Sequence, residues 1–78
     1  MTALTKKEII RALRDDETGT PAMIYEDNTC NFSARKVTTK MTHKLQGEGY
    51  LAVSPGDYVY IRADLVEGNT HVHESLRR

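Results

Sequence analysis

A stretch in the middle of the chain, residues 33–46, carries four basic side chains and no acidic one, although the 78-residue chain contains 11 Asp and Glu. Apolar residues within it recur three or four positions apart, which is the spacing of one face of an α-helix. Two glycines, Gly47 and Gly49, follow it, and then come two short runs of aliphatic and aromatic residues. A basic helix that leads into a β-hairpin is the arrangement that this pattern predicts.

On a helix running from Ser33 to Leu45, apolar and polar side chains separate onto opposite faces. Asn31 or Ser33 can cap its N-terminus, and Gly47 can end it. The apolar stripe consists of Ala34, Val37, Met41 and Leu45. The outward face presents Arg35, Lys36, Thr39, His43 and Gln46, with Lys40 and Thr42 on its flanks.

Two further helices are expected before the basic one. Thr5 and Glu8 have the spacing of a capping box, and Leu4 and Ile9 have that of the hydrophobic staple around it, so a first helix should begin at Thr5. Residues 20–26 start with a Thr-Pro pair, which is typical of the first turn of a helix, and they predict a short second helix.

Two short strands and a tail are expected after the basic helix. Residues 50–53 and 58–62 alternate in polarity as strands do, and a Pro-Gly pair between them suits a tight turn. Beyond Arg62 the pattern weakens, and a further hairpin, a short helix and a partly disordered tail all remain open. We therefore expect one domain over residues 1–63 and a C-terminal extension, residues 64–78, that could serve for dimerisation.

Three helices, a turn and a β-hairpin in this order resemble the winged helix-turn-helix family of small transcription regulators from prokaryotes, phages, plasmids and archaea. The local likeness is the pattern Val37-x-x-x-Met41-x-x-x-Leu45-x-Gly47-x-Gly49-Tyr50-Leu51, since many members end the recognition helix in this way before the wing. The resemblance covers about residues 4–62. It implies an α+β fold in which a β-hairpin wing follows three helices. The polar linker of residues 27–32 is longer than the family's usual turn.

The resemblance implies that the basic helix enters the major groove of double-stranded DNA, where donors on its outward face reach bases and phosphates. Arg35, near the expected N-terminal end, could donate two hydrogen bonds to guanine, so Arg35→Ala would lower specific affinity by roughly 1–3 kcal/mol. The wing tip carries Asp57 and no Lys or Arg, so the helix should supply most of the binding. The predicted DNA-binding residues are Ser33, Arg35, Lys36, Thr39, Lys40, Thr42, His43 and Lys44.

Composition narrows the classes of function. A formal net charge of zero is unlike a nonspecific nucleic-acid coat, but it allows a local basic surface, because acids concentrate at residues 15–17 and 26–27. The sequence has no nucleophile motif and no phosphate-binding loop. His71 and His73 are two ligands, whereas a structural zinc site needs about four. We expect no enzyme activity, no catalytic residue, no metal, no cofactor and no small-molecule ligand.

Cysteine content and hydropathy indicate the cellular compartment, and the length of the basic helix indicates the oligomeric state. The single cysteine, Cys30, suits a reducing cytoplasm, and no apolar run approaches the roughly 20 residues of a membrane span. The N-terminus lacks the apolar region of a signal peptide. A homodimer is expected, because one short helix reads few base pairs. Two alternatives stay open: a protein–protein interaction module on the same scaffold, and an accessory DNA-binding factor of a mobile element.

Overall fold

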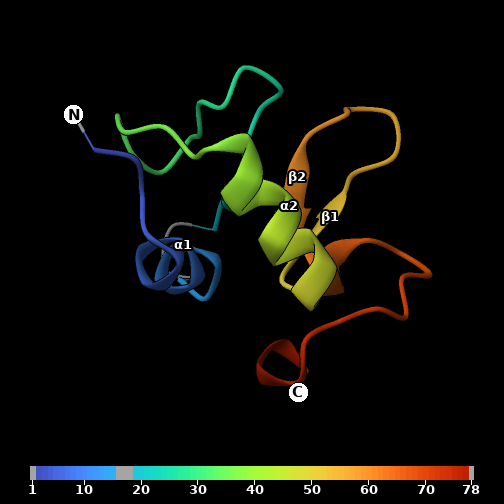
Figure 1. Cartoon of the computed structure of the whole chain (residues 1–78). Coiled ribbons are helices and arrows are strands. Elements are labelled where there is room, and N and C mark those ends of the chain that lie inside the picture. The colour runs from blue at the N-terminus through green and yellow to red at the C-terminus, as the bar shows by residue number, and fades with distance from the viewer. Residues whose placement is uncertain (1, 16–18, 78) are drawn as a thin grey trace.

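The computed structural model describes residues 2–15 and 19–77, so only Asp15 of the acidic run at residues 15–17 is included. These residues form an α+β domain with two α-helices, α1 (Lys6–Leu13) and α2 (Thr39–Glu48), and an antiparallel sheet of β1 (Leu51–Val53) and β2 (Tyr60–Arg62). Figure 1 shows α2 between α1 and the hairpin. No helix in the described part of the chain is long and apolar enough to cross a membrane.

The first helix begins where the sequence predicts. Thr5 accepts a hydrogen bond from the backbone N–H of Glu8, and the Glu8 carboxylate accepts one from the backbone N–H of Thr5. This reciprocal pair is the predicted capping box, and it satisfies two donors at the helix start. The apolar stripe of α1 buries Ile9 and Leu13, and Leu4 joins them in the same core cluster.

The predicted second helix is absent from the described residues, and the prediction of three helices is wrong for this part of the chain. Ile24 is instead extended and forms β-bridges to Cys30 and to Tyr60 of β2. Its N–H and C=O both pair with Tyr60 at 2.9 Å, and its side chain is only 1% exposed. A two-turn helix is marginal by itself, whereas the bridge satisfies both backbone groups of Ile24 and buries its side chain.

The basic helix begins at Thr39 and not at Ser33, because Thr38 is its cap and accepts a hydrogen bond from Met41 N at 3.1 Å. The six residues before Thr39 are irregular. Both backbone groups of Val37 bond to Asn28: Val37 N–H donates to Asn28 O at 2.9 Å, and Asn28 Nδ2 donates to Val37 O at 2.7 Å. These long-range bonds occupy the groups that an earlier helix start would have used.

The basic helix also ends later than predicted. Gly47 lies inside α2, and Gly49 ends the helix in the left-handed region with φ 88°. Tyr50 N–H then donates to Leu45 O at 2.9 Å, which is the long return bond of a Schellman ending. This ending turns the chain directly into β1.

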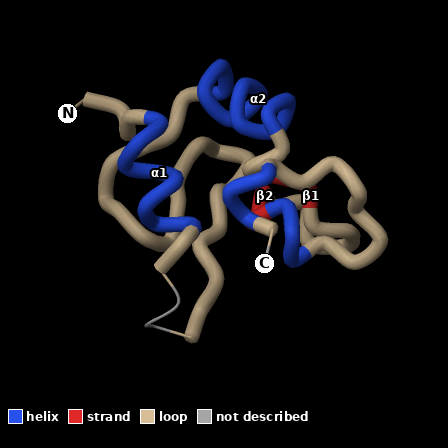
Figure 2. The backbone as a smooth tube through the Cα atoms, turned by 90° about the horizontal axis from the view of Figure 1, so that it is seen from below, coloured by secondary structure: helices blue, strands red, loops and turns tan. Residues whose placement is uncertain are grey.

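The hairpin is shorter than predicted, and it pairs Leu51 with Arg62, Ala52 with Ile61 and Val53 with Tyr60. Leu51 is buried, whereas Val53, two residues further along the same strand, is 40% exposed. Figure 2 shows the same arrangement of helices and hairpin from below. The core cluster consists of Leu4, Ile9, Leu13, Ile24, Val37, Leu45, Tyr50, Leu51 and Leu76.

The C-terminal segment packs back onto the domain. After β2 come two 3-10 turns, Ala63–Leu65 and Glu74–Leu76, separated by irregular chain. His73 N–H donates to Gly49 O at 2.8 Å, and the His73 ring stacks on Tyr50 with the ring centres 4.0 Å apart. Leu76 is buried in the core cluster. The sequence allowed a second hairpin, a short helix or a partly disordered tail after Arg62. The described residues 63–77 form short helical turns and no second hairpin.

Candidate functional site

The outward side of α2 presents cationic and small side chains to solvent. We define the basic face by five exposed residues, one just before the helix and four on it: Lys36, Thr39, Lys40, His43 and Lys44. Gly47 is exposed on the same side, and a side chain there would meet nothing within 4 Å. The acidic residue of α2, Glu48, lies in its last turn and forms an ion pair with Lys6 of α1.

Within the described chain, no carboxylate forms an ion pair with the three lysines of the basic face. Lys6 holds the pKa of the Glu48 carboxyl below its usual value through a hydrogen bond, so Glu48 stays ionised with a partner on α1. Hydrogen bonds from Thr29 lower the pKa of Asp27, and the charge of Lys36 adds to this more weakly. The strongest interactions of both carboxyls are thus with groups outside the basic face, and Lys36 and Lys44 act on them only through their charge.

Local contacts fix the start of the basic face. Asn28 has a left-handed backbone with φ 74°, and its Nδ2 donates to Thr39 Oγ1 at 3.1 Å. Thr38 caps α2, and no acidic residue occupies the first turn. The positive end of the helix dipole and Lys40 therefore lie together at the N-terminus. The result is a capped, positively charged helix end.

Arg35 does not lie on the exposed helix face where the sequence placed it. Its Nη1 forms an ion pair with the Glu8 carboxylate at 2.6 Å, and its Nε and Nη2 donate to the carbonyls of Thr2 and Ala3 at 2.9 and 2.8 Å. Since Ser33–Thr38 is irregular, Arg35 turns toward α1. The guanidinium ties the N-terminal segment to the chain that precedes α2.

Two more of the predicted contact residues are turned inward or lie outside the helix. Thr42 is only 4% exposed, and its hydroxyl donates to Thr38 O at 3.0 Å. Ser33 lies before α2, where its hydroxyl accepts a hydrogen bond from Arg35 N at 3.1 Å. The shift of the helix start explains both corrections, because the sequence assigned faces to a helix that began too early.

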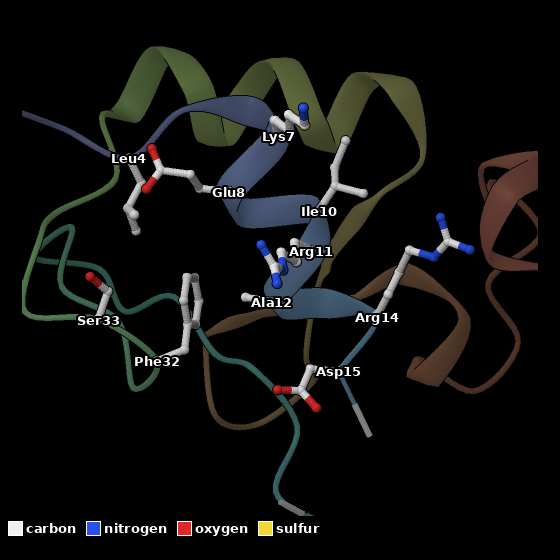
Figure 3. A pocket seen from close by; sticks show the side chains of 10 residues that line it. All are labelled: Leu4, Lys7, Glu8, Ile10, Arg11, Ala12, Arg14, Asp15, Phe32 and Ser33. Atoms are coloured by element: carbon white, nitrogen blue, oxygen red, sulfur yellow. The ribbon is translucent and has the colours of Figure 1, made fainter. Parts of the chain in front are cut away.

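An open groove of about 960 Å³ runs along α1, and the sequence did not indicate it. Figure 3 shows Phe32 and Ser33, from the segment before α2, facing Leu4, Glu8 and Ala12. The complete lining is Leu4, Lys7, Glu8, Ile10, Arg11, Ala12, Arg14, Asp15, Phe32 and Ser33. Phe32 belongs to no helix or strand. The spacing of apolar residues in the sequence, which predicts helices and strands, therefore does not predict this groove.

The two C-terminal histidines, His71 and His73, interact with different partners. His71 Nε2 lies 2.9 Å from Gly47 O, at the end of α2, whereas His73 stacks on Tyr50. Within residues 2–15 and 19–77, no three side chains of His, Cys, Asp or Glu lie together as a metal site would need.

Comparisons of the chain with protein-family models, curated proteins and solved structures find no match. On the basic face, exposed cationic and polar side chains of α2 and of the segment before it lie together.

Proposed function

We propose that this protein binds double-stranded DNA through the basic face of α2 and acts as a small transcription regulator. The observation that carries the proposal is an exposed surface with Lys40 and Lys44 on α2 and Lys36 in the segment before it, none of which is ion-paired to a described carboxylate. An α-helix fits the major groove, and unpaired lysines on it gain free energy by releasing the counterions of DNA phosphates.

The residues of the basic face take different roles in this proposal. The three lysines neutralise phosphates, whereas Thr39 and His43 are short enough to approach base edges. Gly47 adds no side chain to the same face, so the end of α2 can lie close to the DNA backbone. Arg35, Thr42 and Ser33 are left out of the contact set, because their side chains are engaged within the protein.

We further propose that the scaffold is a variant of the winged helix in which turns replace the second helix. Support comes from the order of elements, since α2 passes through Gly49 straight into β1 and a hairpin. The Asn28 turn, rather than a packed helix, holds the start of α2. The hairpin tip carries Asp57 and an exposed Tyr58, so it adds little charge attraction to DNA.

Specific recognition in this proposal uses two copies of the chain, because a single helix reads few base pairs. Leu76 of the tail is buried in its own domain and is not free to meet a second copy. Leu65, in the 3-10 turn after β2, is 49% exposed and is the apolar tail residue that a dimer contact would cover. Sedimentation on a palindromic duplex measures the stoichiometry.

The salt dependence of duplex binding tests the function. With three phosphate contacts, the logarithm of the affinity should fall against the logarithm of salt with a slope of about −2.7, a loss of roughly 40-fold between 50 and 200 mM salt. Fluorescence anisotropy with a random pool of duplexes and with sequences selected from it measures this slope. No binding to any duplex at 50 mM salt would end the proposal.

Exchange of Arg35 and Lys36 by alanine should separate folding from binding. Arg35→Ala removes the tie between the N-terminal segment and the chain before α2, so it should lower the melting temperature and leave DNA affinity unchanged when folded. Lys36→Ala removes an exposed charge, so it should leave the melting temperature unchanged and reduce the salt slope by about 1. Thermal melting followed by circular dichroism measures the effect on stability, and anisotropy titration at several salt concentrations measures the effect on DNA binding. If Arg35→Ala instead lowered DNA affinity without changing the melting temperature, Arg35 would contact DNA and the proposed role of its ion pair would be wrong.

A protein–protein interaction module is the second candidate, and the groove along α1 is the observation that favours it. Leu4, Ile10 and Phe32 give the groove an apolar part, while basic residues of α1 line it as well. In that case an affinity experiment with labelled chain would capture one protein partner, and duplex DNA would neither bind nor compete.

A further inference from the structure

A small polar cavity lies between the end of α1 and the C-terminal 3-10 turn. Its volume is about 290 Å³, and it is lined by Arg14, Arg62, Ser75, Leu76 and Arg77. Three guanidinium groups thus line one cavity, and none of the described residues that line it carries a carboxylate. Figure 3 shows the Arg14 side chain extending away from the groove residues Phe32 and Ser33, toward the C-terminal segment.

One of the three arginines is a fixed wall of the cavity. The Arg62 side chain is 11% exposed, and its Nε and Nη2 bond to the two carboxylate oxygens of Asp64 at 2.5 and 2.7 Å. Its Nη1 also donates to Leu13 O, the last residue of α1, at 3.2 Å. Arg62 therefore holds the end of α1 against the tail, and Asp64 compensates its charge.

The other two arginines form no ion pair with a described carboxylate. Arg77 donates from Nε to Val72 O at 3.2 Å and from Nη2 to Thr70 O at 3.4 Å, so its guanidinium is positioned by neutral carbonyls. The exposed Arg14 side chain has no hydrogen bond or ion pair to a described residue. The hydroxyl of Ser75 lies 2.9 Å from His73 Nδ1 and is a further polar group at the cavity.

We propose that this cavity binds a phosphate-type oxyanion between the guanidinium groups of Arg14 and Arg77. Like charges that line a small cavity repel each other, and an anion between them removes that repulsion. The planar fork of a guanidinium also matches the oxygens of a phosphate with two parallel hydrogen bonds. A volume of about 290 Å³ leaves room for an anion of this size.

The same chemistry has two possible sources: free inorganic phosphate and a backbone phosphate of a nucleic acid. The cavity lies at the end of α1 and the tail, whereas the basic face lies on α2, so the two proposals stand on different residues. Failure of duplex binding would leave the oxyanion site intact, and failure of phosphate binding would leave the basic face intact.

Nuclear magnetic resonance of the whole ¹⁵N-labelled chain with inorganic phosphate tests the site. At constant ionic strength, the backbone amides of Arg14, Ser75 and Arg77 and the Nε–H of both arginines should shift in one saturable curve. Arg14→Gln and Arg77→Gln should each weaken this binding at least ~10-fold, because each removes a charged hydrogen-bonding partner. Arg11→Gln is the matched control, since Arg11 is an exposed arginine of α1 outside the cavity lining and should leave the curve unchanged.

The outcomes are distinct. Shifts that grow linearly with phosphate, or that weaken equally in Arg11→Gln, would overturn the proposal, because they indicate general screening by salt. Both Gln variants should retain the dispersed amide spectrum of the parent, so loss of binding is read on folded protein. Addition of a short duplex then identifies the source: competition with phosphate at these residues indicates a backbone phosphate, and independent binding indicates the free anion.

Discussion

Gly49→Ala is expected to destabilise the protein by about 3 kcal/mol or more, a large part of the roughly 4–12 kcal/mol that holds a domain of this size together. Gly49 has φ +88°, a conformation that costs a residue with a side chain about 1–2 kcal/mol. A Cβ at this position would also lie 2.6 Å from the backbone N of His73 and 3.1 Å from the carbonyl carbon of Val72. Urea unfolding followed by circular dichroism measures the loss.

Gly47→Ala is the matched control for this prediction. Gly47 lies inside α2 without a positive φ, and a Cβ added there would meet no atom within 4 Å. Alanine there should stabilise the helix by about 0.5–1 kcal/mol. Equal effects of the two substitutions would contradict the close approach of the tail to the end of α2.

Gly49→Asn separates the two causes of the expected loss. Asparagine tolerates the left-handed backbone better than alanine does, but it has the same Cβ. If the contact with His73 dominates, Asn should be about as destabilising as Ala. If backbone strain dominates, Asn should recover most of the lost stability.

Reversal of two charges on the basic face is the second large expected effect. Lys40→Glu with Lys44→Glu should weaken duplex binding roughly 100-fold at 100 mM salt and bring the salt slope from about −2.7 to about −1. Both side chains are exposed on the outward side of α2, so the fold should persist. Anisotropy titrations at several salt concentrations measure both quantities.

The control for this prediction is a single charge reversal on the other helix. Arg11→Glu changes the net charge as much as Lys40→Glu does, but Arg11 lines the groove along α1. Under the proposal, Lys40→Glu weakens binding strongly and Arg11→Glu only slightly. The same loss in both would mean that binding follows net charge, and the basic face would lose its role as a specific surface.

Nearby residues alone decided the features that the sequence predicted correctly. The capping box of α1 joins Thr5 to Glu8 within one turn, so its partners are visible in the sequence. The α+β order and the hairpin follow from short apolar runs around a Pro-Gly turn. Lys36, Lys40 and Lys44 are exposed as predicted, since charged side chains rarely lose water without a partner.

Long-range pairing decided the rest. The segment around Ile24 is extended and not helical, because Tyr60, far along the chain, forms hydrogen bonds with both backbone groups of Ile24. Arg35 does not lie on the predicted helix face, because its guanidinium forms an ion pair with Glu8 and hydrogen bonds with carbonyls of the N-terminal segment. Local pattern determined where the charged helix and the hairpin occur in this protein. Only the tertiary structure decided where that helix starts and which side chains its outward face presents, because backbone groups bond to the best partner in space and not to the nearest one in sequence.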